Sequence, residues 1–391
     1  MTSPSVPGQH PAPAQNPYPV QPIWTAPPPV PRRGGLAFAI VGIVLGAVIA
    51  AIVVVYLTWA LGIPTFLVAA FLALIPLAIV LAAVQWVDRW EPEPRWALLF
   101  AFLWGAAVSV AIALVVDLGV QYAVVFATPG GSPDEAAQAV VQAPFVEELA
   151  KGVGILLVFW FSRSHFDGPV DGLVYAATIA AGFAFTENIV YFGQSFAESG
   201  AAGLGTTFVV RGLFSPFAHV LFTACTGIMV GIGARRGATW GILGWFVAGL
   251  AVAMALHALW NGSLVFADAI GLYFTVQVPI FVGFVLLTVY LRREEVALTR
   301  LRLGEYAAAG WLTPGEVDAL ATPAGRRHAL VWARTQYPPR TAEVKGLVRD
   351  ATTLAFNRQL IVTGRGDVGR VQDEGLLLRR LQERRTALLR A

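Results

Sequence analysis

Long apolar segments separated by short polar ones run through most of this chain. Eight segments between residues 36 and 291 each reach the roughly 20 residues that a helix needs to cross about 30 Å of hydrocarbon. The pattern therefore predicts an all-α, polytopic membrane protein with about eight transmembrane helices. We expect these helices at residues 36–59, 65–87, 96–126, 136–161, 169–195, 206–234, 239–266 and 270–291.

Basic residues fall on one side of this arrangement if successive helices alternate in direction. The opposite connections, at about 127–135, 196–205 and 267–269, contain no Lys or Arg. Because Lys and Arg stay on the cytoplasmic side, we expect a multi-pass cell-membrane protein with both termini in the cytoplasm. Arg211 is the exception near the outer end of the sixth segment, and we expect it to extend outward or to pair with Asp117 or Glu198.

The composition agrees with a membrane protein, because 57% of the residues are hydrophobic and only 13% are charged. Soluble domains carry about 25% charged residues. The first 34 residues differ from the rest, since they hold 11 of the 25 prolines. Such a segment cannot bury a core, so residues 1–34 are expected to form a disordered, Pro-rich cytosolic tail and residues 35–291 the transmembrane domain.

Residues 292–391 form a third region, with 18 Lys and Arg residues against 11 Asp and Glu. Thr313, followed by Pro314 and Glu316, has the pattern of a helix start with a capping box. A further helix rich in Arg and Leu is expected near 370–390. We interpret this region as a basic cytosolic helical tail that could contact anionic lipid headgroups, and we expect no nucleic-acid partner because no aromatic or fold pattern points to one.

Ionisable residues lie near the middle of four consecutive apolar segments. Such residues are rare inside a bilayer and usually mark a functional site. At about 1.5 Å per helical residue, all four positions lie between about 21 and 27 Å from the cytoplasmic end of their own helix. The sequence therefore predicts one polar site inside the bundle, at or above the middle of the membrane. The residues concerned are Glu147 with Glu148, Glu187, His219 and His257.

The first of these positions carries two adjacent carboxylates. Glu147 and Glu148 are about 100° apart on a helix, so one is expected to face the site. The other can pair with Lys151, which is three and four residues further on. The alternative is a buried Glu–Lys pair that only holds helices together.

The other three positions each have a polar or aromatic companion within one helical turn. Glu187 follows Phe183 at four residues and precedes Asn188. Hydrogen bonding between helices is the structural alternative for each of them. Pro144 and Pro216 each lie three residues before a motif residue, where an opened helix could admit water. The remaining companions are Thr223, four residues after His219, and Asn261, four residues after His257.

In order, spacing and helix placement, this series resembles the PrsW-type intramembrane proteases, which are relatives of the CAAX prenyl endopeptidase and bacteriocin-processing superfamily. The resemblance extends over roughly residues 85–290 and says nothing about the two tails. The motifs that carry it are Glu147-Glu148-x-x-Lys151, Phe183-x-x-x-Glu187-Asn188, His219-x-x-x-Thr223 and His257-x-x-x-Asn261.

The resemblance implies roles for these residues. Glu147 would activate water with support from Glu148, while His257 and Asn261 would stabilise the oxyanion. Glu187 stands where CAAX-type relatives have a His, and His219 is an additional imidazole. Zn²⁺ is the expected cofactor if a metal is used, with Glu187, His219 and His257 as its ligands, although no HExxH pattern is present.

The resulting hypothesis is an intramembrane endopeptidase, of metallo- or glutamate type, that cuts a membrane-associated protein. The family resemblance implies single-span regulators such as anti-sigma factors, cleaved near the outer face at site 1. Two alternatives remain open. One is a CAAX-like or bacteriocin-maturation peptidase, and the other is a proton-coupled or metal-ion transporter that uses the same Glu and His residues.

Overall fold

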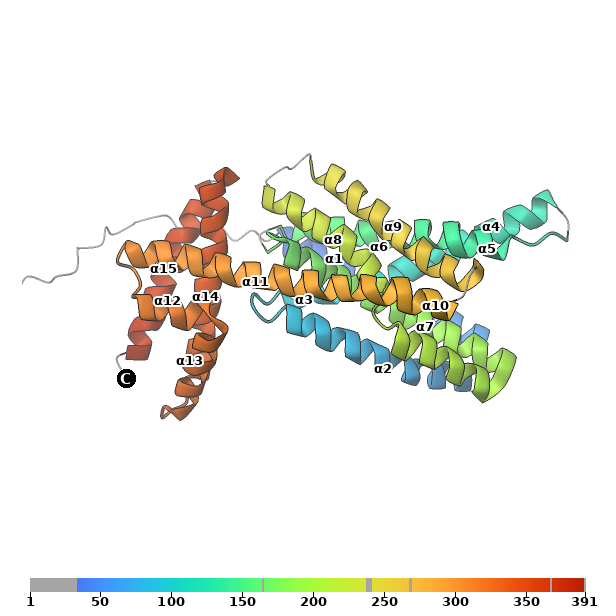
Figure 1. Ribbon diagram of the computed structural model, residues 1–391, viewed down its shortest axis with the longest axis horizontal. Helices are drawn as coiled ribbons and strands as arrows, with labels where there is room; N and C mark the ends of the chain where they lie inside the picture. Colours follow the sequence, from blue (N-terminus) through green and yellow to red (C-terminus); the bar gives the residue numbers. More distant parts are fainter. Residues whose placement is uncertain are drawn as a thin grey trace, which may run out of the picture.

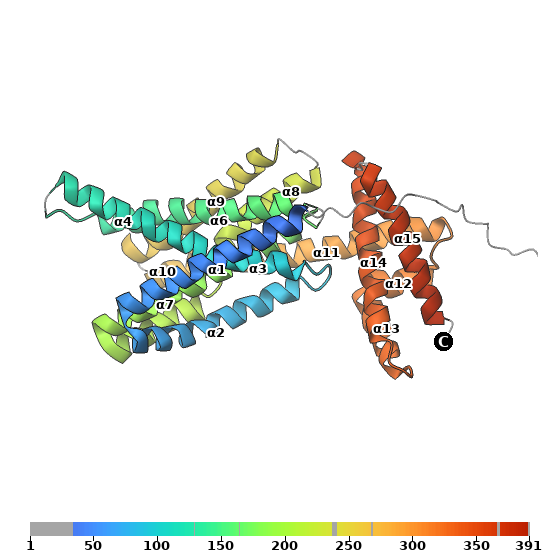
Figure 2. The same cartoon turned by 180° about the vertical axis from the view of Figure 1, so that it is seen from behind.

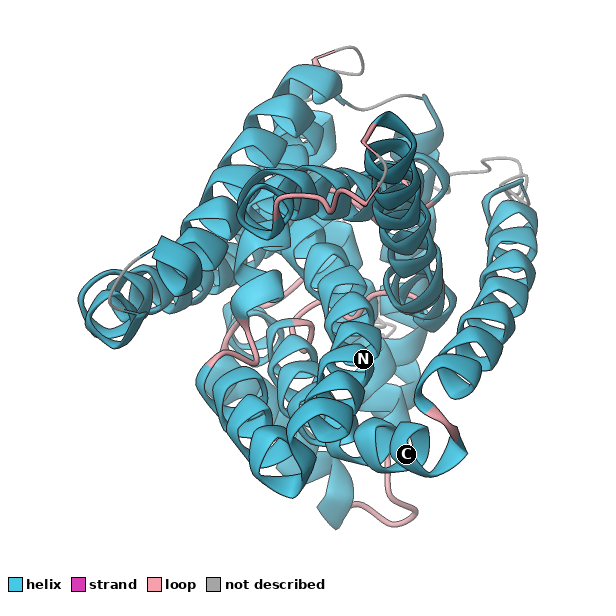
Figure 3. Ribbon diagram, turned by 90° about the vertical axis from the view of Figure 1, so that its right-hand side faces the viewer, coloured by secondary structure: helices cyan, strands magenta, loops and turns pink. Residues whose placement is uncertain are grey.

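A computed structural model describes residues 34–128, 130–163, 165–236, 241–266, 269–365 and 368–389 of this protein. These residues form helices and connecting loops without any strand, as Figures 1 and 3 show. The all-α, polytopic membrane fold is thus confirmed. The expected Pro-rich tail lies outside the described residues, apart from its last position.

The membrane part is built from α-helices and from π-helical segments, labelled η. Its elements are α1 (Gly34–Leu61), α2 (Ile63–Val87), α3 (Arg95–Leu103), η1 (Trp104–Ser109), α4 (Val110–Ala127), α5 (Glu135–Ala137), η2 (Gln138–Gln142), α6 (Ala143–Phe161), α7 (Pro169–Thr207), η3 (Phe208–Phe214), α8 (Ala218–Arg236), α9 (Ile242–Phe266), α10 (Ala269–Leu272), η4 (Tyr273–Gln277) and α11 (Val278–Ala308). The segments η1, η2 and η4 each join two α-helices without a break, so that one long helix results from three elements.

Six described segments are long and apolar enough to cross a membrane, compared with the eight expected. Two physical features account for the difference. The segment Pro169–Arg236 counts once, although it contains both α7 and α8. The helix α6 is absent from the six, and it carries the three charged residues Glu147, Glu148 and Lys151 within its 19 residues.

Helix α7 lies at the centre of the bundle and is buried almost continuously from Pro169 to Phe183. Its glycines allow backbones to approach closely. A Cβ atom on Gly172 would lie 1.9 Å from the carbonyl oxygen of Gly227 on α8, and one on Gly182 would lie 2.3 Å from that of Phe102 on α3. Small residues at such crossings are the usual way in which membrane helices pack.

The chain reverses and breaks between α7 and α8. Gly200 has a φ of 61°, a conformation that glycine adopts at little cost, and it interrupts the helical backbone within α7. Ser215 is non-helical, with a φ of −130°, and Pro216 and Phe217 follow it before α8 begins. The expected opening at Pro216 is therefore confirmed, whereas Pro144 lies inside the first turn of α6, directly after η2.

The C-terminal region forms a small helical domain beside the membrane part (Figure 2). Helix α11 continues through the expected boundary at residues 291 and 292 and joins the two parts. The predicted capping box is present, because Thr313 and Glu316 exchange hydrogen bonds at the start of the next helix. The helices of this domain are α12 (Pro314–Ala321), α13 (Pro323–Thr335), α14 (Thr341–Leu360), η5 (Ile361–Arg365) and α15 (Val368–Leu389).

Candidate functional site

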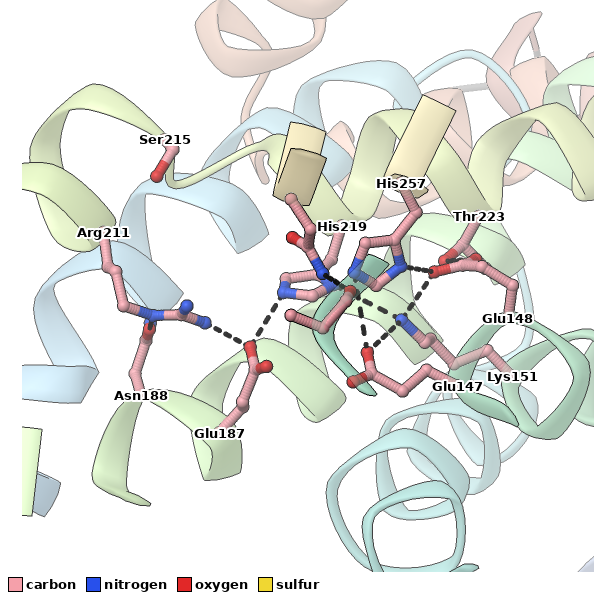
Figure 4. A network of polar contacts seen from close by, with 12 residues as sticks. Glu147, Glu148, Lys151, Glu187, Asn188, Arg211, Ser215, His219, Thr223 and His257 are labelled. Carbon is pink, nitrogen blue, oxygen red and sulfur yellow. Dashed lines mark hydrogen bonds and ion pairs between the residues drawn. The ribbon is translucent and has the colours of Figure 1, made fainter. Parts of the chain in front are cut away.

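The polar residues of four membrane helices meet inside the bundle, as the sequence predicts (Figure 4). Helix α6 contributes two carboxylates and a lysine, α7 contributes Glu187, and α8 and α9 each contribute one histidine. Helix α6 packs closely at this level because Gly154 leaves room for Trp104 and because the Trp104 indole donates a hydrogen bond to the carbonyl of Ala150.

Lys151 connects the two carboxylates of α6. Its ammonium nitrogen lies 2.7 Å from Oε1 of Glu148 and 3.4 Å from Oε2 of Glu147. Both Lys151 and Glu148 are completely buried. A buried ammonium requires close anionic partners, and this pair provides them.

Glu148 also fixes the orientation of His257. Nδ1 of His257 lies 3.0 Å from Oε1 of Glu148, and the hydroxyl of Thr223 donates to Oε2 at 2.8 Å. A carboxylate can only accept, so Nδ1 carries the hydrogen and the lone pair of the neutral ring is on Nε2. That nitrogen lies 3.9 Å from Oε2 of Glu147.

His219 has the same kind of support from a different carboxylate. Its Nε2 lies 2.8 Å from Oε2 of Glu187, and its Nδ1 lies 3.3 Å from the ammonium of Lys151. Because the ammonium can only donate, Nδ1 accepts and Nε2 donates to Glu187. The two imidazole rings lie 5.2 Å apart and nearly perpendicular.

Arg211 completes this chain of contacts. Its guanidinium pairs with Glu187, and its Nε donates to the side-chain oxygen of Asn188 at 3.0 Å. The expected pairing with Asp117 or Glu198 is therefore wrong. The reversal at Gly200 returns the chain so that Arg211 lies at the level of Glu187. Asp117 instead accepts hydrogen bonds from Gln121 and Gln138, and Glu198 is exposed. The similar spacing of Glu187 and Arg211 from Gly200 is the sequence signal that could have indicated their pairing.

The remaining predicted residues surround this cluster. The Phe183 ring lies 4.0 Å from the Lys151 ammonium and 5.4 Å from the His219 ring. The side-chain amide of Asn261 donates to the carbonyl of Ala139 on η2 at 2.7 Å. The structure thus brings together the carboxylates, histidines and Lys151 of the four motifs with Phe183 and Thr223, while Asn188 and Asn261 bond to neighbouring segments.

Three donors in this cluster fit a metal ion. One donor atom each from Glu147, His219 and His257 lies within 4.8 Å of the other two. Two histidines and one glutamate are a common ligand set of catalytic zinc. Each histidine also donates its other ring hydrogen to a carboxylate, which is the usual support for a metal-binding imidazole. A metal ion on Nδ1 of His219 would replace the Lys151 ammonium as the partner of that nitrogen.

The sequence-based ligand set contained Glu187 in place of Glu147. In the structure Glu187 contacts His219 through the hydrogen-bearing nitrogen and is paired with Arg211. That position suits a residue that orients a ligand. The ligand role of Glu187 stays a prediction, and the geometry favours Glu147.

Sequence comparison places this cluster in a family. The sequence family described as PrsW family intramembrane metalloprotease matches residues 93–288, which is half of the chain and includes every motif residue. No solved structure shows a significant match.

Curated relatives named Protease PrsW also match this chain. The protein from Geobacillus kaustophilus is 32% identical over 144 residues, which cover 37% of this chain and 57% of the relative. The one from Clostridioides difficile is 33% identical over 159 residues, 41% of this chain and 63% of the relative. The one from Bacillus subtilis is 28% identical over 175 residues, 44% of this chain and 72% of the relative.

The match therefore spans less than two thirds of the length of the first two relatives. The family match extends over residues 93–288. It covers the Glu and His residues of the polar cluster together with the helices that carry them. On this basis the chain belongs to the PrsW family of intramembrane metalloproteases.

Proposed function

We propose that this protein is an intramembrane endopeptidase that hydrolyses a peptide bond in a membrane protein. The observation that carries the proposal is the arrangement of Glu147 opposite His257. Glu148 holds Nδ1 of His257, so that the free nitrogen Nε2 is directed toward Oε2 of Glu147 at 3.9 Å. That separation is too long for a direct hydrogen bond and is suitable for a water molecule that contacts both atoms.

The proposed reaction uses Glu147 as the proton carrier. Glu147 accepts a proton from the water as the water oxygen attacks the carbonyl carbon of the substrate. When the tetrahedral intermediate collapses, the carbon–nitrogen bond breaks and Glu147 returns the proton to the leaving amine. The products are a carboxylic acid and an amine, and no further reactant is required.

His257 and Asn261 are proposed to stabilise the oxyanion, as the family resemblance implies. In that role Nε2 of His257 would have to carry a proton, because Nδ1 already donates to Glu148 and the neutral ring has only a lone pair on Nε2. Asn261 would have to exchange its hydrogen bond to Ala139 for one to the substrate. Lys151 supplies positive charge 3.4 Å from Glu147 and lies in a fully buried position, where charge interactions are strong.

We propose zinc as the metal of this site, with Glu147, His219 and His257 as its ligands and Glu148 and Glu187 as their supports. Zinc bound there would polarise the substrate carbonyl and lower the pKa of a bound water. The two roles proposed for Glu147 are alternatives. With zinc bound, Glu147 would be a ligand, and in metal-free protein Glu147 and His257 would hold the water between them, with Glu147 as the proton carrier described above.

The substrate and the orientation belong to the same proposal. A site at this depth in the bilayer suits a single-span membrane protein, and the family resemblance supports a regulator such as an anti-sigma factor cut at site 1. The distribution of Arg residues supports cytoplasmic termini. The Arg-rich helix α15 is proposed to contact anionic lipid headgroups. We also propose that the chain divides into a tail, a membrane domain and a C-terminal domain, with boundaries at residues 34 and 291.

The test is cleavage of single-span test peptides by the purified protein in proteoliposomes, with the cut site located by mass spectrometry. Glu147→Gln and His257→Ala should each lower the cleavage rate at least about 100-fold. Exposed residues of the same type supply the controls, so Glu198→Gln and His328→Ala should cleave at the wild-type rate. Wild-type activity in both site variants would exclude the proposed mechanism.

A further inference from the structure

An apolar pocket opens next to the polar cluster, where the chain breaks between η3 and α8. Its volume is about 270 Å³. Its walls come from the break itself and from α8, α9, η4 and the start of α11. Representative lining residues are Leu213, Phe217, Leu221, Leu256, Trp260 and Phe281.

Phe222 joins this pocket to the polar cluster. It lines the pocket on one side, and its ring stacks on the His257 ring at 4.9 Å with an angle of 20°. The same ring contacts His219 edge-on at 6.0 Å. The pocket residues Ala218 and Leu256 each precede one of these two histidines in the chain. A group in the pocket would therefore lie one side chain away from the proposed reaction centre.

No charged residue lines the pocket, and the side chains of Ser215, Tyr273 and Gln277 already have partners. The Tyr273 hydroxyl donates to the carbonyl of Phe214, and the Ser215 hydroxyl donates to the carbonyl of Val210. Gln277 donates to the hydroxyl of Ser263. A charged group entering the pocket would lose its hydration without gaining an oppositely charged partner. The lining thus selects an apolar group.

The size and the entrance fit a large side chain that arrives from the lipid. A cavity of about 150 Å³ holds one benzene molecule, so 270 Å³ is enough for a leucine, phenylalanine or methionine side chain. Three of the lining residues, Leu213, Phe214 and Leu259, are about half exposed on the surface of the bundle. A membrane-spanning peptide could reach the pocket along this side without crossing a polar region.

We propose that this pocket binds a large apolar side chain of the substrate next to the bond that is cut. The proposal rests on the proposed endopeptidase function and adds to it a preference at one substrate position. Its occupant is a residue of a membrane-spanning peptide. A lipid acyl chain is the competing occupant that the experiment must distinguish.

The experiment changes the pocket at Phe281, which lines it from α11 and lies outside the polar cluster. Phe281→Ala enlarges the pocket and Phe281→Trp reduces it. Single-span test peptides with Ala, Leu, Phe or Trp at the residue beside the cut site are compared in proteoliposomes. Phe281→Ala should raise the kcat/KM ratio of Trp to Leu peptides at least about fivefold, and Phe281→Trp should shift preference toward Ala by a similar factor.

Leu286→Ala supplies the control, because Leu286 lies on the exposed side of the same helix and does not line the pocket. It should leave the preference unchanged. An unchanged preference in both Phe281 variants would overturn the proposal, because a residue with only a structural role would lower the rates for all peptides alike.

A binding experiment keeps the proposal separate from the enzymatic function. Glu147→Gln protein is crosslinked to a single-span peptide that carries benzoylphenylalanine, and the labelled residues are identified. Labelling within residues 213–222 or 273–281 supports the pocket even if wild-type protein cuts no peptide, which by itself would refute only the proposed function. Labelling of these residues by a photoactivatable phospholipid that excess peptide does not displace would assign the pocket to lipid and overturn the proposal.

Discussion

Nδ1 of His257 on α9 lies 3.0 Å from Oε1 of Glu148 on α6, and the same carboxylate oxygen accepts the shortest contact of Lys151 at 2.7 Å. Glu148 therefore holds one histidine and one ammonium in fixed positions. Neither carboxylate of the adjacent pair is redundant, because Glu147 keeps an oxygen directed toward His257 while Glu148 supports that residue from the other side.

The first prediction concerns the stability contributed by Lys151. Replacing it by methionine leaves the carboxylates of Glu147 and Glu148 buried without their common cation. Loss of one member of a buried ion pair costs about 3–5 kcal/mol. We expect Lys151→Met to lower the unfolding temperature in detergent strongly, and the double variant Lys151→Met/Glu148→Gln to recover part of the loss. A double variant that is less stable than the single one would contradict the ion-pair role.

A second prediction concerns Arg211, which contacts both Glu187 and Asn188. Arg211→Ala should lower kcat at least about tenfold, because Glu187 loses the cation that fixes it against His219. Arg211→Lys should restore little, since an ammonium cannot contact both partners in the same fork geometry. Arg293→Ala, an exposed arginine on α11, is the control and should keep wild-type activity. Full recovery in Arg211→Lys would mean that only the charge matters.

The partner of Arg211 was not predicted from the sequence, unlike the residues of the polar cluster. The apolar periodicity and the four motifs are local properties, and they predicted that Glu187 lies in one cluster with the buried residues Glu147, His219 and His257. The pairing of Arg211 depends on the reversal at Gly200, which an apolar pattern does not reveal.

The same limit applies to the interrupted helices and to α6. Hydropathy treats an α-helix and a π-helical segment alike, so η1, η2 and η4 could not be predicted from it. Pro216 marks a true break, whereas Pro144 lies directly after the π-helical segment η2, inside a helix that continues from α5 to α6 without a break. Whether a proline interrupts a helix therefore depends on the backbone conformation of the residues before it.

A third prediction separates the two possible ligand sets of the metal. Elemental analysis of protein purified in detergent should give close to one zinc per chain for the wild type, and the double variant His219→Ala/His257→Ala should have lost it. Glu147→Gln should lower the bound zinc more than Glu187→Gln does, because Glu187 contacts His219 from the outer side. The reverse order would favour the ligand set expected from the sequence.

A fourth prediction concerns pH and Asp167, which lies in the loop between α6 and α7. Burial and the nearby charge of Asp171 raise the pKa of Asp167 to about 8, from a usual value of 3.8. The folded protein therefore keeps a proton that the unfolded chain loses near pH 4. Between about pH 4 and pH 8 the folded state binds more protons, so this residue makes stability fall as the pH rises.

Asp167→Asn removes that contribution. The unfolding temperature of the variant, relative to wild type, should rise between pH 5 and pH 8 by at least about 2 °C. Asp318→Asn, which changes an exposed aspartate of the C-terminal domain, should show no such trend. Glu93 keeps some pH dependence in both proteins, because burial raises the pKa of its carboxyl group as well. If the unfolding temperatures of wild type and Asp167→Asn changed with pH in parallel, the raised pKa of Asp167 would be contradicted.

The last prediction concerns how the C-terminal domain is held against the membrane part. Arg326 on α13 donates to the carbonyl of Trp90 at 3.0 Å, to that of Leu320 at 2.7 Å and to the hydroxyl of Thr352 at 2.6 Å. Its guanidinium also lies 3.3 Å from the Trp90 ring. Trp90 in turn donates from its indole to Thr299 on α11 at 3.1 Å.

Arg326 therefore connects α13 to α14 and to the loop between α2 and α3. Arg326→Leu keeps an apolar stem but leaves three acceptors without their donor, at a cost of about 1–3 kcal/mol for each one that stays buried. We expect limited proteolysis to cut the connection between α12 and α13 or the loop around Trp90 faster than in wild type. Arg327→Leu, the exposed neighbour, should be cut at the wild-type rate. Equal rates for the two variants would show that other contacts hold the domain in place.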